Sequence, residues 1–335
     1  MAHCGKFHEQ SLSRREMLTR CANGFGGVAL ASMLAEEVQA KSFNPLAPKK
    51  AHFAPKAKHV IFLYMDGGPS SVDTFDPKPR LAKENGKPFG LKMEATQFNN
   101  NGKTLASPWK FQHYGQSGIP ISELFPHVAR HADKLSVIRS MTSDFSEHTN
   151  GNYFLHTGFG QVGRPSMGSW INYGLGTSNQ NLPGFVVLNG GLIPPGGLGC
   201  FSNGFLPAAY QGSVFKYGAK PIANIARTEA TAQLQQNKLN LIRKLDAGVV
   251  GRLGQLDQLE SAITNHELAF RMQAAVPELV DLKGESEATK KLYGLDEKFR
   301  NTATFGRNCL IARRLVERGV RFIELTCPGG NGDRW

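Results

Sequence analysis

The strongest pattern in this chain is a set of apolar runs, each followed by a loop rich in glycine or polar residues. Residues 60–65 are apolar throughout and end at an Asp-Gly-Gly-Pro turn. Further apolar-rich runs occupy 135–139, 184–188 and 320–325. A run that is apolar on both faces is typical of a central parallel strand. We therefore expect these runs to form one sheet, with 60–65 in its interior and next or nearly next to 320–325.

Apolar positions at helical spacing separate these runs. They predict helices over 122–132, 150–156, 166–175 and most of 224–275, and a further helix that ends at Gly319. The region 224–275 carries an apolar stripe of Leu234, Leu241, Leu245, Leu253, Leu256, Leu259 and Ile263. Because glycines interrupt this stripe, we expect it to pack on the core or cap it rather than form a coiled coil. Strands that alternate with helices predict an α/β fold, a mostly parallel sheet flanked by helices.

Three segments lack any periodic pattern. Residues 41–57 are rich in Pro, Lys and Ala, and they are predicted to be a linker. Residues 76–118 are rich in Pro, Gly, Asn and Lys, and we expect an irregular excursion there. Residues 189–220 form a long loop rich in Gly and Pro, of a kind that is usually functional or mobile. The main domain is therefore expected over 58–335.

The N-terminus is predicted to be an export signal over residues 1–40. A serine, Ser13, precedes Arg14-Arg15, and an apolar residue, Met17, lies two positions after the pair. A mildly apolar stretch rich in Gly and Ala then leads to a small-residue cleavage site at Ala40. The alternative is an ordinary amphipathic helix, which the glycines disfavour. The motif resembles a twin-arginine signal, so we expect a periplasmic or extracellular protein without stable membrane insertion.

Composition narrows the classes of partner. The 335 residues carry a formal net charge of +12, and 40% of them are hydrophobic, enough for a sizeable core. A basic surface favours anionic partners such as sulfated sugars, phosphates or envelope polymers, although it can also be a merely solvated face. We expect no nucleic-acid partner, because the chain has no long Lys/Arg block with interleaved aromatics and no zinc-finger or RNA-binding signature. The cysteines are widely spaced and imply no disulfide framework.

Three carboxylates follow the first predicted strand: Asp66, Asp73 and Asp76. Open α/β sheets bind ligands at the carboxyl ends of their strands, and hard divalent cations prefer oxygen ligands. These residues are therefore candidate metal ligands, as is Asp333 in the loop after the last predicted strand. The alternative is turn chemistry, since an Asp before Gly or Pro is often only a turn former.

Three stretches together resemble one family. They are MDGGPSSVDTFDPKP at 65–79, RSMT at 139–142 with His148 and Thr157-Gly158, and RPSMGSWINYGLG at 164–176 followed by LPGFVV at 182–187. In these stretches the chain resembles the DUF1501 family, twin-arginine-exported proteins of planctomycete-type bacteria that are grouped with the sulfatases and alkaline phosphatases. The resemblance runs from about residue 58 to the end.

The resemblance implies an alkaline-phosphatase-like α/β core with a metal site at its strand ends. In that superfamily an Asp after the first strand binds metal, and Asp66 stands in that place, whereas Asp73 and Asp76 belong to the more constant part of the family pattern. Any of the three could ligate the cation, which could be Ca, Zn, Mg or Mn. Family members continue past the position of Trp335 with an Asp and a His. We therefore expect a core that is incomplete at the C-terminus, and an inactive, poorly soluble product from this chain alone.

The nucleophile is the least defined part of the expected site. Sulfatases that use formylglycine carry Cys-x-Pro-Ser-Arg, and no cysteine here has that context, so we exclude that mechanism. Their motif precedes a Leu-Thr-Gly helix end that resembles 155–158 here, and the same spacing leads back to His148 and Thr149. Thr149 could be a phosphatase-type nucleophile at a helix N-terminus, with His148 as a ligand or general acid. Alternatively, Thr149 only caps the helix.

Two functions of different classes are compatible with these patterns. The first is a secreted metal-dependent hydrolase of sulfate or phosphate esters, acting on small molecules or polysaccharides. The second is a non-catalytic member of the same fold that binds an anionic polysaccharide or an envelope partner. The acidic residues at the strand end favour the hydrolase, and the missing sulfatase nucleophile favours the binding protein.

Overall fold

The computed structural model describes residues 44–90, 102–191, 193–218, 220–223, 225–253 and 257–329. The predicted signal at 1–40 and the candidate ligand Asp333 lie outside the described residues. In the described part of the chain, no helix is long and apolar enough to cross a membrane.

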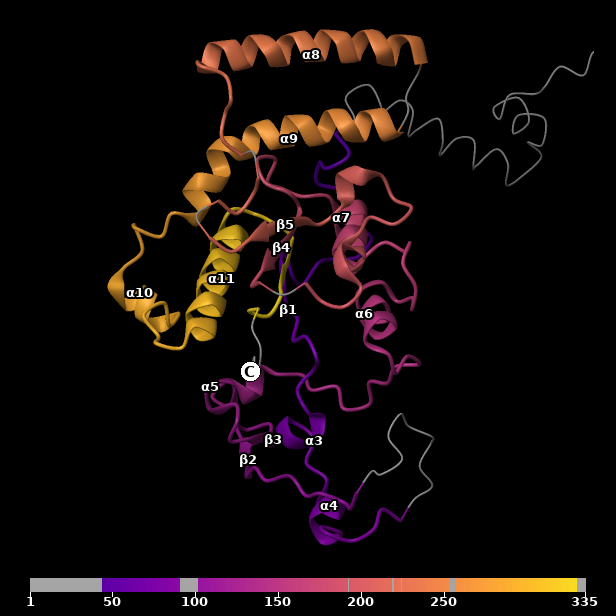
Figure 1. Cartoon of the computed structure of the whole chain (residues 1–335), viewed down its shortest axis with the longest axis vertical. Coiled ribbons are helices and arrows are strands. Elements are labelled where there is room, and N and C mark those ends of the chain that lie inside the picture. The colour runs from indigo at the N-terminus through magenta and orange to yellow at the C-terminus, as the bar shows by residue number, and fades with distance from the viewer. Residues whose placement is uncertain are drawn as a thin grey trace, which may run out of the picture.

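One parallel sheet forms the centre of the molecule (Figure 1). Its strand order is β1-β6-β4-β5, with bounds Val60–Leu63, Phe322–Leu325, Phe185–Asn189 and Ser213–Lys216. Strands β1 and β6 pair in parallel from Val60↔Phe322 to Leu63↔Leu325. The prediction that these two segments are neighbouring parallel strands is confirmed.

The position of β1 differs from the prediction. It ends the strand order of the described sheet instead of lying inside it. Ile61 is 44% exposed and Leu63 is 52% exposed, so the face of β1 that these two residues share is not covered. An apolar run predicts a strand in the sheet, but it does not show whether a neighbouring strand pairs with one edge of it or with both.

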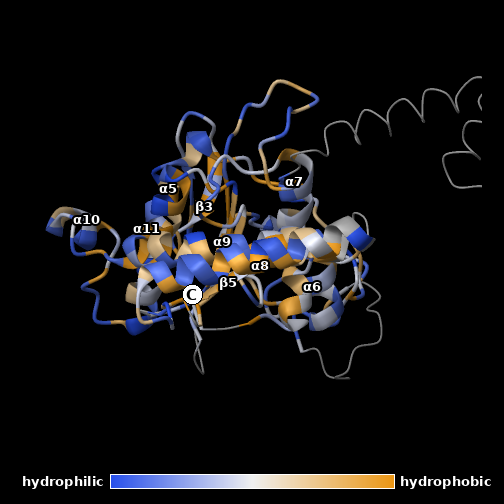
Figure 2. Ribbon diagram, turned by 90° about the horizontal axis from the view of Figure 1, so that it is seen from above, coloured by the Kyte–Doolittle hydropathy of each residue, from blue (hydrophilic) through white to orange (hydrophobic). Residues whose placement is uncertain are grey.

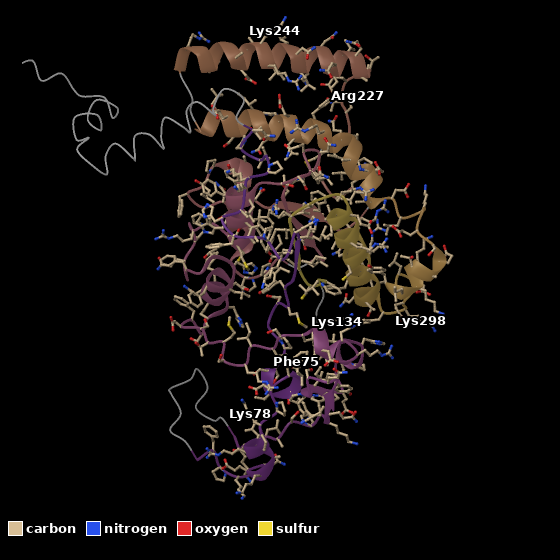
Figure 3. All side chains as sticks on the ribbon, turned by 180° about the vertical axis from the view of Figure 1, so that it is seen from behind. Phe75, Lys78, Lys134, Arg227, Lys244 and Lys298 are labelled. Carbon is tan, nitrogen blue, oxygen red and sulfur yellow. The ribbon has the colours of Figure 1, made fainter. Side chains whose placement is uncertain are left out.

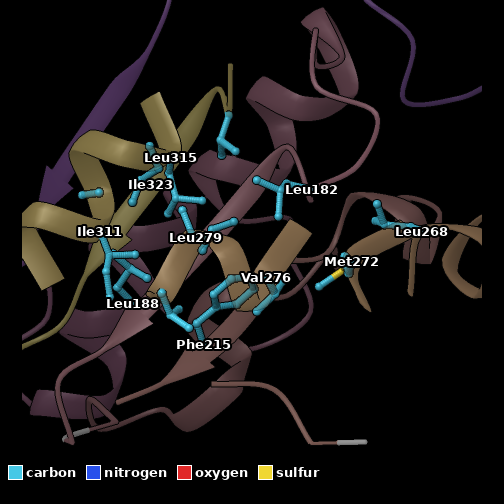
Figure 4. Packing of buried hydrophobic residues seen from close by; sticks show 14 of the residues in the cluster. Leu182, Leu188, Phe215, Leu268, Met272, Val276, Leu279, Ile311, Leu315 and Ile323 are labelled. Carbon is cyan, nitrogen blue, oxygen red and sulfur yellow. The ribbon is translucent and has the colours of Figure 1, made fainter. Parts of the chain in front are cut away.

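Alternate residues of β6 enter two separate hydrophobic clusters, one on each face of the sheet. Ile323 and Leu325 face helices α9 (Asp257–Val280) and α11 (Arg300–Glu317), where they pack with the residues drawn in Figure 4. Phe322 faces the other side and packs with Phe185, Val187, Cys200 and Phe201. Since successive side chains of a strand point to opposite faces, this double burial explains why apolar residues dominate 320–325.

Helices α6 (His148–Thr157) and α7 (Met167–Leu175) lie on the face opposite α11 (Figure 1). Both confirm predicted helices, and α6 starts two residues earlier than expected. Helix α7 ends at Gly176, whose φ is +60° and where an added Cβ would lie 1.9 Å from the Ala47 carbonyl oxygen. The first residues of the predicted linker therefore contact the domain, and Leu46 is buried there. Residues 44–57 contain no helix or strand.

Part of the segment 76–118, expected to be irregular, belongs to a small lobe at one end of the molecule (Figure 1). The antiparallel pair β2 (Phe111–Tyr114) and β3 (Ile119–Ser122) forms its sheet. Short helices surround the pair: α3 Ser71–Thr74, α4 Pro79–Lys83, α5 Pro126–Ala129 and the 3₁₀ turn η2 Ala132–Lys134. Ile121, Ala129 and Ala132 are its buried centre.

Two predictions near this lobe were wrong. Residues 135–139 belong to no strand, and Ile138 is 67% exposed, because no neighbouring strand takes up this short apolar run. The helix expected over 122–132 starts only at Pro126, since Ser122 is the last residue of β3. The proline stands at the first helical position, where its missing N–H costs no hydrogen bond.

The long helical region forms two helices, α8 (Ala232–Leu253) and α9, with the short α10 (Glu287–Leu292) before α11. Helix α9 packs on the core, but Leu234, Leu241 and Leu245 of α8 are all more than half exposed. The expectation that the whole apolar stripe packs on the core is therefore wrong for this part of it. The predicted loop 189–220 contains the 3₁₀ turns η3 (Gly197–Phe201) and η4 (Ala208–Tyr210) as well as β5.

Candidate functional site

A pocket of about 580 Å³ opens where β1 ends and α6 begins. Its walls come from the turn after β1, from the segment before α6, and from the first turns of α6. Gly67 and Gly68 on the first wall have φ of 80° and 67°, a conformation that only glycine adopts without strain. The strand-end location agrees with the general rule for ligand sites in parallel sheets.

Asp66 lies just behind this pocket and is only 7% exposed. The Tyr64 hydroxyl lies 3.1 Å from Asp66 Oδ1 and also contacts Asn152 Oδ1. Asn152 Nδ2 in turn donates to the His148 carbonyl oxygen at 2.7 Å. Burial, reinforced by the charge of Asp66, raises the pKa of Tyr64, so its hydroxyl stays neutral and links the strand end to α6.

Cys327 connects the ends of β1 and β6. The Asp66 N–H donates to Cys327 Sγ at 3.4 Å. The Cys327 thiol in turn donates to the Tyr64 carbonyl oxygen at 3.4 Å. Two segments that are more than 260 residues apart in sequence therefore meet at the same sheet end. Asp333, six residues after Cys327, lies outside the described residues.

The first turn of α6 is capped by a residue that the sequence interpretation did not consider. Glu147 is the N-cap, and its Oε2 accepts from the N–H groups of Thr149 at 2.9 Å and Asn150 at 3.1 Å. These two backbone hydrogen bonds lower the pKa of Glu147. The alternative that Thr149 caps the helix is therefore wrong. His148 is exposed and lines the pocket.

Asp73 and Asp76 have their own partners, away from Asp66. Side-chain hydrogen bonds, the stronger from Ser107 and the weaker from Ser70, lower the pKa of Asp73. Asp76 forms an ion pair with Lys78 at 2.6 Å, and Arg139 Nε lies 3.9 Å from its other oxygen. Figure 3 labels Lys78 in the lobe around β2 and β3. The structure thus brings Asp66 and His148 to one pocket and places the carboxylates of Asp73 and Asp76 in other contacts.

The described residues contain no group of three or more His, Cys, Asp or Glu side chains that could hold a metal ion. Asp66 is the one expected ligand among them that adjoins the pocket, behind the lining residues Met65 and Gly67. The described part of the chain therefore does not by itself fit a complete divalent-cation site. Candidate ligands outside it, such as Asp333, are not tested by this observation.

A buried ion pair lies beneath the pocket, in the core between α6 and the sheet. His156 Nε2 is 2.8 Å from Glu324 Oε1, and the two side chains are 1% and 3% exposed. His156 Nδ1 lies 2.8 Å from the Asn152 carbonyl oxygen. The rings of Phe62, Tyr64 and Phe201 surround the imidazole, Tyr64 at 4.8 Å between centroids. Burial raises the pKa of Glu324, and the hydrogen bond from His156 opposes this shift.

Sequence reasoning missed this pair, although one signal was present. Glu324 is the one charged residue inside the strand Phe322–Leu325. A carboxylate in a strand buried on both faces needs a partner, because a lone buried charge is strongly unfavourable. That signal predicts that a partner exists but does not identify it, because His156 lies 168 residues earlier in the chain.

A family model described as a protein of unknown function (DUF1501) matches residues 57–335. The match covers nearly all of the chain that follows the predicted signal and linker. No curated protein and no solved structure matches this chain.

Proposed function

Because this chain belongs to the DUF1501 family, for which no activity is described, we propose a function from its pocket. The protein is a hydrolase of sulfate or phosphate esters that uses a divalent cation and acts outside the cytoplasm. Its core is alkaline-phosphatase-like, and the anionic ester belongs to a small molecule or a polysaccharide. The observation that carries this proposal is the pocket at the carboxyl end of β1, with Asp66 behind it and the N-terminus of α6 at its wall.

The chain's own residues suit an anionic ester in three ways. The backbone at Gly67 and Gly68 leaves room for close approach of a ligand, since no atom lies within 4 Å of where a Cβ would stand. The partial positive charge at the N-terminus of α6 favours a negative group. His148, exposed on the pocket wall, is placed to give a proton to a leaving group or to take one from a nucleophile. Thr149, in the first turn of α6 next to His148, is the proposed nucleophile by its place in the sequence pattern; it is not among the residues that line the pocket.

A divalent cation would neutralise the ester oxygens and activate the nucleophile. Asp66 is the described residue that we propose as one of its ligands. Asp333 is proposed as a second ligand, because the chain leaves β6 at the same sheet end through Cys327. Asp76 is a weaker candidate, since an ion pair with Lys78 already compensates its charge. Asp73 is also weaker, because it accepts hydrogen bonds from Ser107 and Ser70, away from the pocket.

One observation favours the alternative, a non-catalytic protein that binds an anionic polysaccharide or an envelope partner. Glu147 occupies the N–H groups of Thr149 and Asn150 at the start of α6. An anionic group of a substrate would have to displace that carboxylate before it could use these donors. A binding surface elsewhere on the protein would not require this displacement.

The two functions are distinguished by assaying the 335-residue chain beside the product of its native gene. Aryl phosphate and aryl sulfate esters are the substrates, with Ca, Zn, Mg or Mn added to chelator-treated protein. We expect turnover by the gene product with one of these cations, and a loss of about 10²–10⁴-fold on His148→Gln. Equal turnover by both proteins would show that the site lies wholly within these residues. No turnover, with saturable binding of a sulfated polysaccharide, would establish the alternative.

Localisation rests on the N-terminal motif and has its own test. Changing Arg14 and Arg15 together to lysine should leave the uncleaved precursor in the cytoplasm, because the twin-arginine pathway reads the pair itself. Cell fractionation followed by mass measurement of the N-terminus gives the readout. Normal export of the double variant, or cleavage at a position other than Ala40, would contradict the proposed signal.

A further inference from the structure

Helix α8 carries a row of leucines that faces water. Leu234, Leu241 and Leu245 are 53%, 58% and 61% exposed. Their spacing of seven and four residues places them on one side of the helix. Figures 1 and 2 show α8 as the outermost element at its end of the molecule, with α9 between it and the sheet.

The opposite side of α8 is the one that contacts the rest of the protein. Gln235 Nε2 donates to Gln273 Oε1 of α9 at 2.7 Å, and Arg243 Nε donates to Glu267 Oε1 at 3.0 Å. Leu239 lines a small pocket between the same two helices. These contacts fix the rotation of α8, so the leucine row is held outward by the fold.

The charges on α8 are mostly positive. The helix contains Lys238, Arg243, Lys244 and Arg252 against one carboxylate, Asp246. Arg243 pairs with Glu267, and Lys238 pairs with Glu229 at 2.7 Å. Within the described residues, Lys244 and Arg252 form no ion pair with a carboxylate. Figure 3 places Lys244 at the outer edge of the molecule, and the spacing of Arg252 from Leu234 puts it on the leucine side.

We propose that α8 binds the surface of a bilayer that contains anionic phospholipids and lies in its interface. Leucines gain from an apolar phase, while Lys244 and Arg252 gain from phosphate groups just outside that phase. A polysaccharide supplies the negative charge without an apolar phase. A second copy of this chain supplies leucines, but it presents the same face and hence no described carboxylate for these two cations.

The test is sedimentation of the protein with vesicles of phosphatidylcholine, with and without phosphatidylglycerol. We expect binding to the mixed vesicles, and its loss when high salt screens the charges. Leu241→Gln with Leu245→Gln should weaken this binding by about tenfold or more, because the apolar contact is removed. Asn240→Gln with Ala247→Gln, on exposed positions of the same helix away from the leucines, should leave it unchanged. Residues 1–40 are present in all the proteins compared, so the differences report α8.

Three results would overturn the proposal. The first is equal binding to both vesicle types, or binding that the leucine variant leaves intact. The second is a concentration-dependent dimer in light scattering that the leucine variant dissociates, which would assign the face to a second copy. The third is a fall in the melting temperature of the leucine variant beyond that of its control, which would show that another part of the chain covers these leucines.

Discussion

Replacing Glu324 with alanine is expected to lower the free energy of unfolding by about 3–5 kcal/mol, the cost of breaking a buried pair by removing one partner. The substitution leaves His156 Nε2 without its carboxylate in a site that is almost inaccessible to water. Urea unfolding followed by circular dichroism measures the loss.

The hydrogen-bond geometry explains why the pair is needed. His156 Nδ1 faces the Asn152 carbonyl oxygen, which can only accept, so Nδ1 carries a proton. A second proton lies between Nε2 and Glu324 Oε1, whichever of the two atoms holds it. The pair is therefore neutral as a unit, and removing either side chain destroys that neutrality or leaves an unmet hydrogen bond.

Two further variants distinguish the loss of the charged partner from the loss of side-chain volume at this position. Glu324→Gln should cost much less, about 1 kcal/mol, because the amide can donate to Nε2 of a neutral imidazole. Replacing both residues by leucine should cost less than Glu324→Ala alone, since it removes the polar groups together. A Glu324→Ala protein as stable as the parent would mean that the pair is not buried in solution.

If the proposed function holds, Asp66→Asn is expected to reduce ester hydrolysis by about 100-fold or more, since the cation that we propose Asp66 helps to hold would supply several kcal/mol of transition-state stabilisation. Asparagine keeps the shape of the side chain and can still accept from the Tyr64 hydroxyl. The change therefore tests the charge of the group more than its packing. Initial rates of the two proteins on the same aryl ester give the comparison.

The same measurement decides between the three carboxylates that follow β1. Asp76→Asn should change the rate only a few-fold, because its carboxylate already pairs with Lys78. Asp296→Asn, at an exposed position far along the chain, serves as the control for surface charge. If Asp76→Asn abolished turnover while Asp66→Asn did not, the metal site would have to be placed nearer the small lobe.

The pairing of β1 with β6 could be predicted from sequence because both segments carry the same strong local pattern. Both segments are dominated by apolar residues, and this signal does not depend on knowing the neighbours. The segment 135–139 carries a similar but shorter pattern, and it fails because pairing needs a partner strand that the local sequence does not reveal. Strands β2 and β5 were missed for the converse reason: Phe111–Tyr114 and Ser213–Lys216 are short, and each has polar residues among its four.

The candidate site shows the same limit in chemical terms. The location of Asp66 followed from its place after a strand, and His148 and Thr149 followed from the sulfatase-like spacing back from the helix end at 155–158. The contacts of Tyr64 with Asn152 and of Asp66 with Cys327 join segments 88 and 261 residues apart. Nothing local marks such partners. Glu147 was missed as a cap because Ser, Thr, Asp and Asn are the residues usually preferred there.

Strand β1 has one further consequence. In the described part of the chain its outer edge is bordered by no other strand, and Val60–Leu63 contains none of the lysines, prolines or bulges that usually protect such an edge. The backbone groups along that edge form a template of fixed spacing, with apolar side chains at every position. The sheet is therefore extensible on one side: an extended segment that meets β1 can continue the hydrogen-bond ladder that β6 begins.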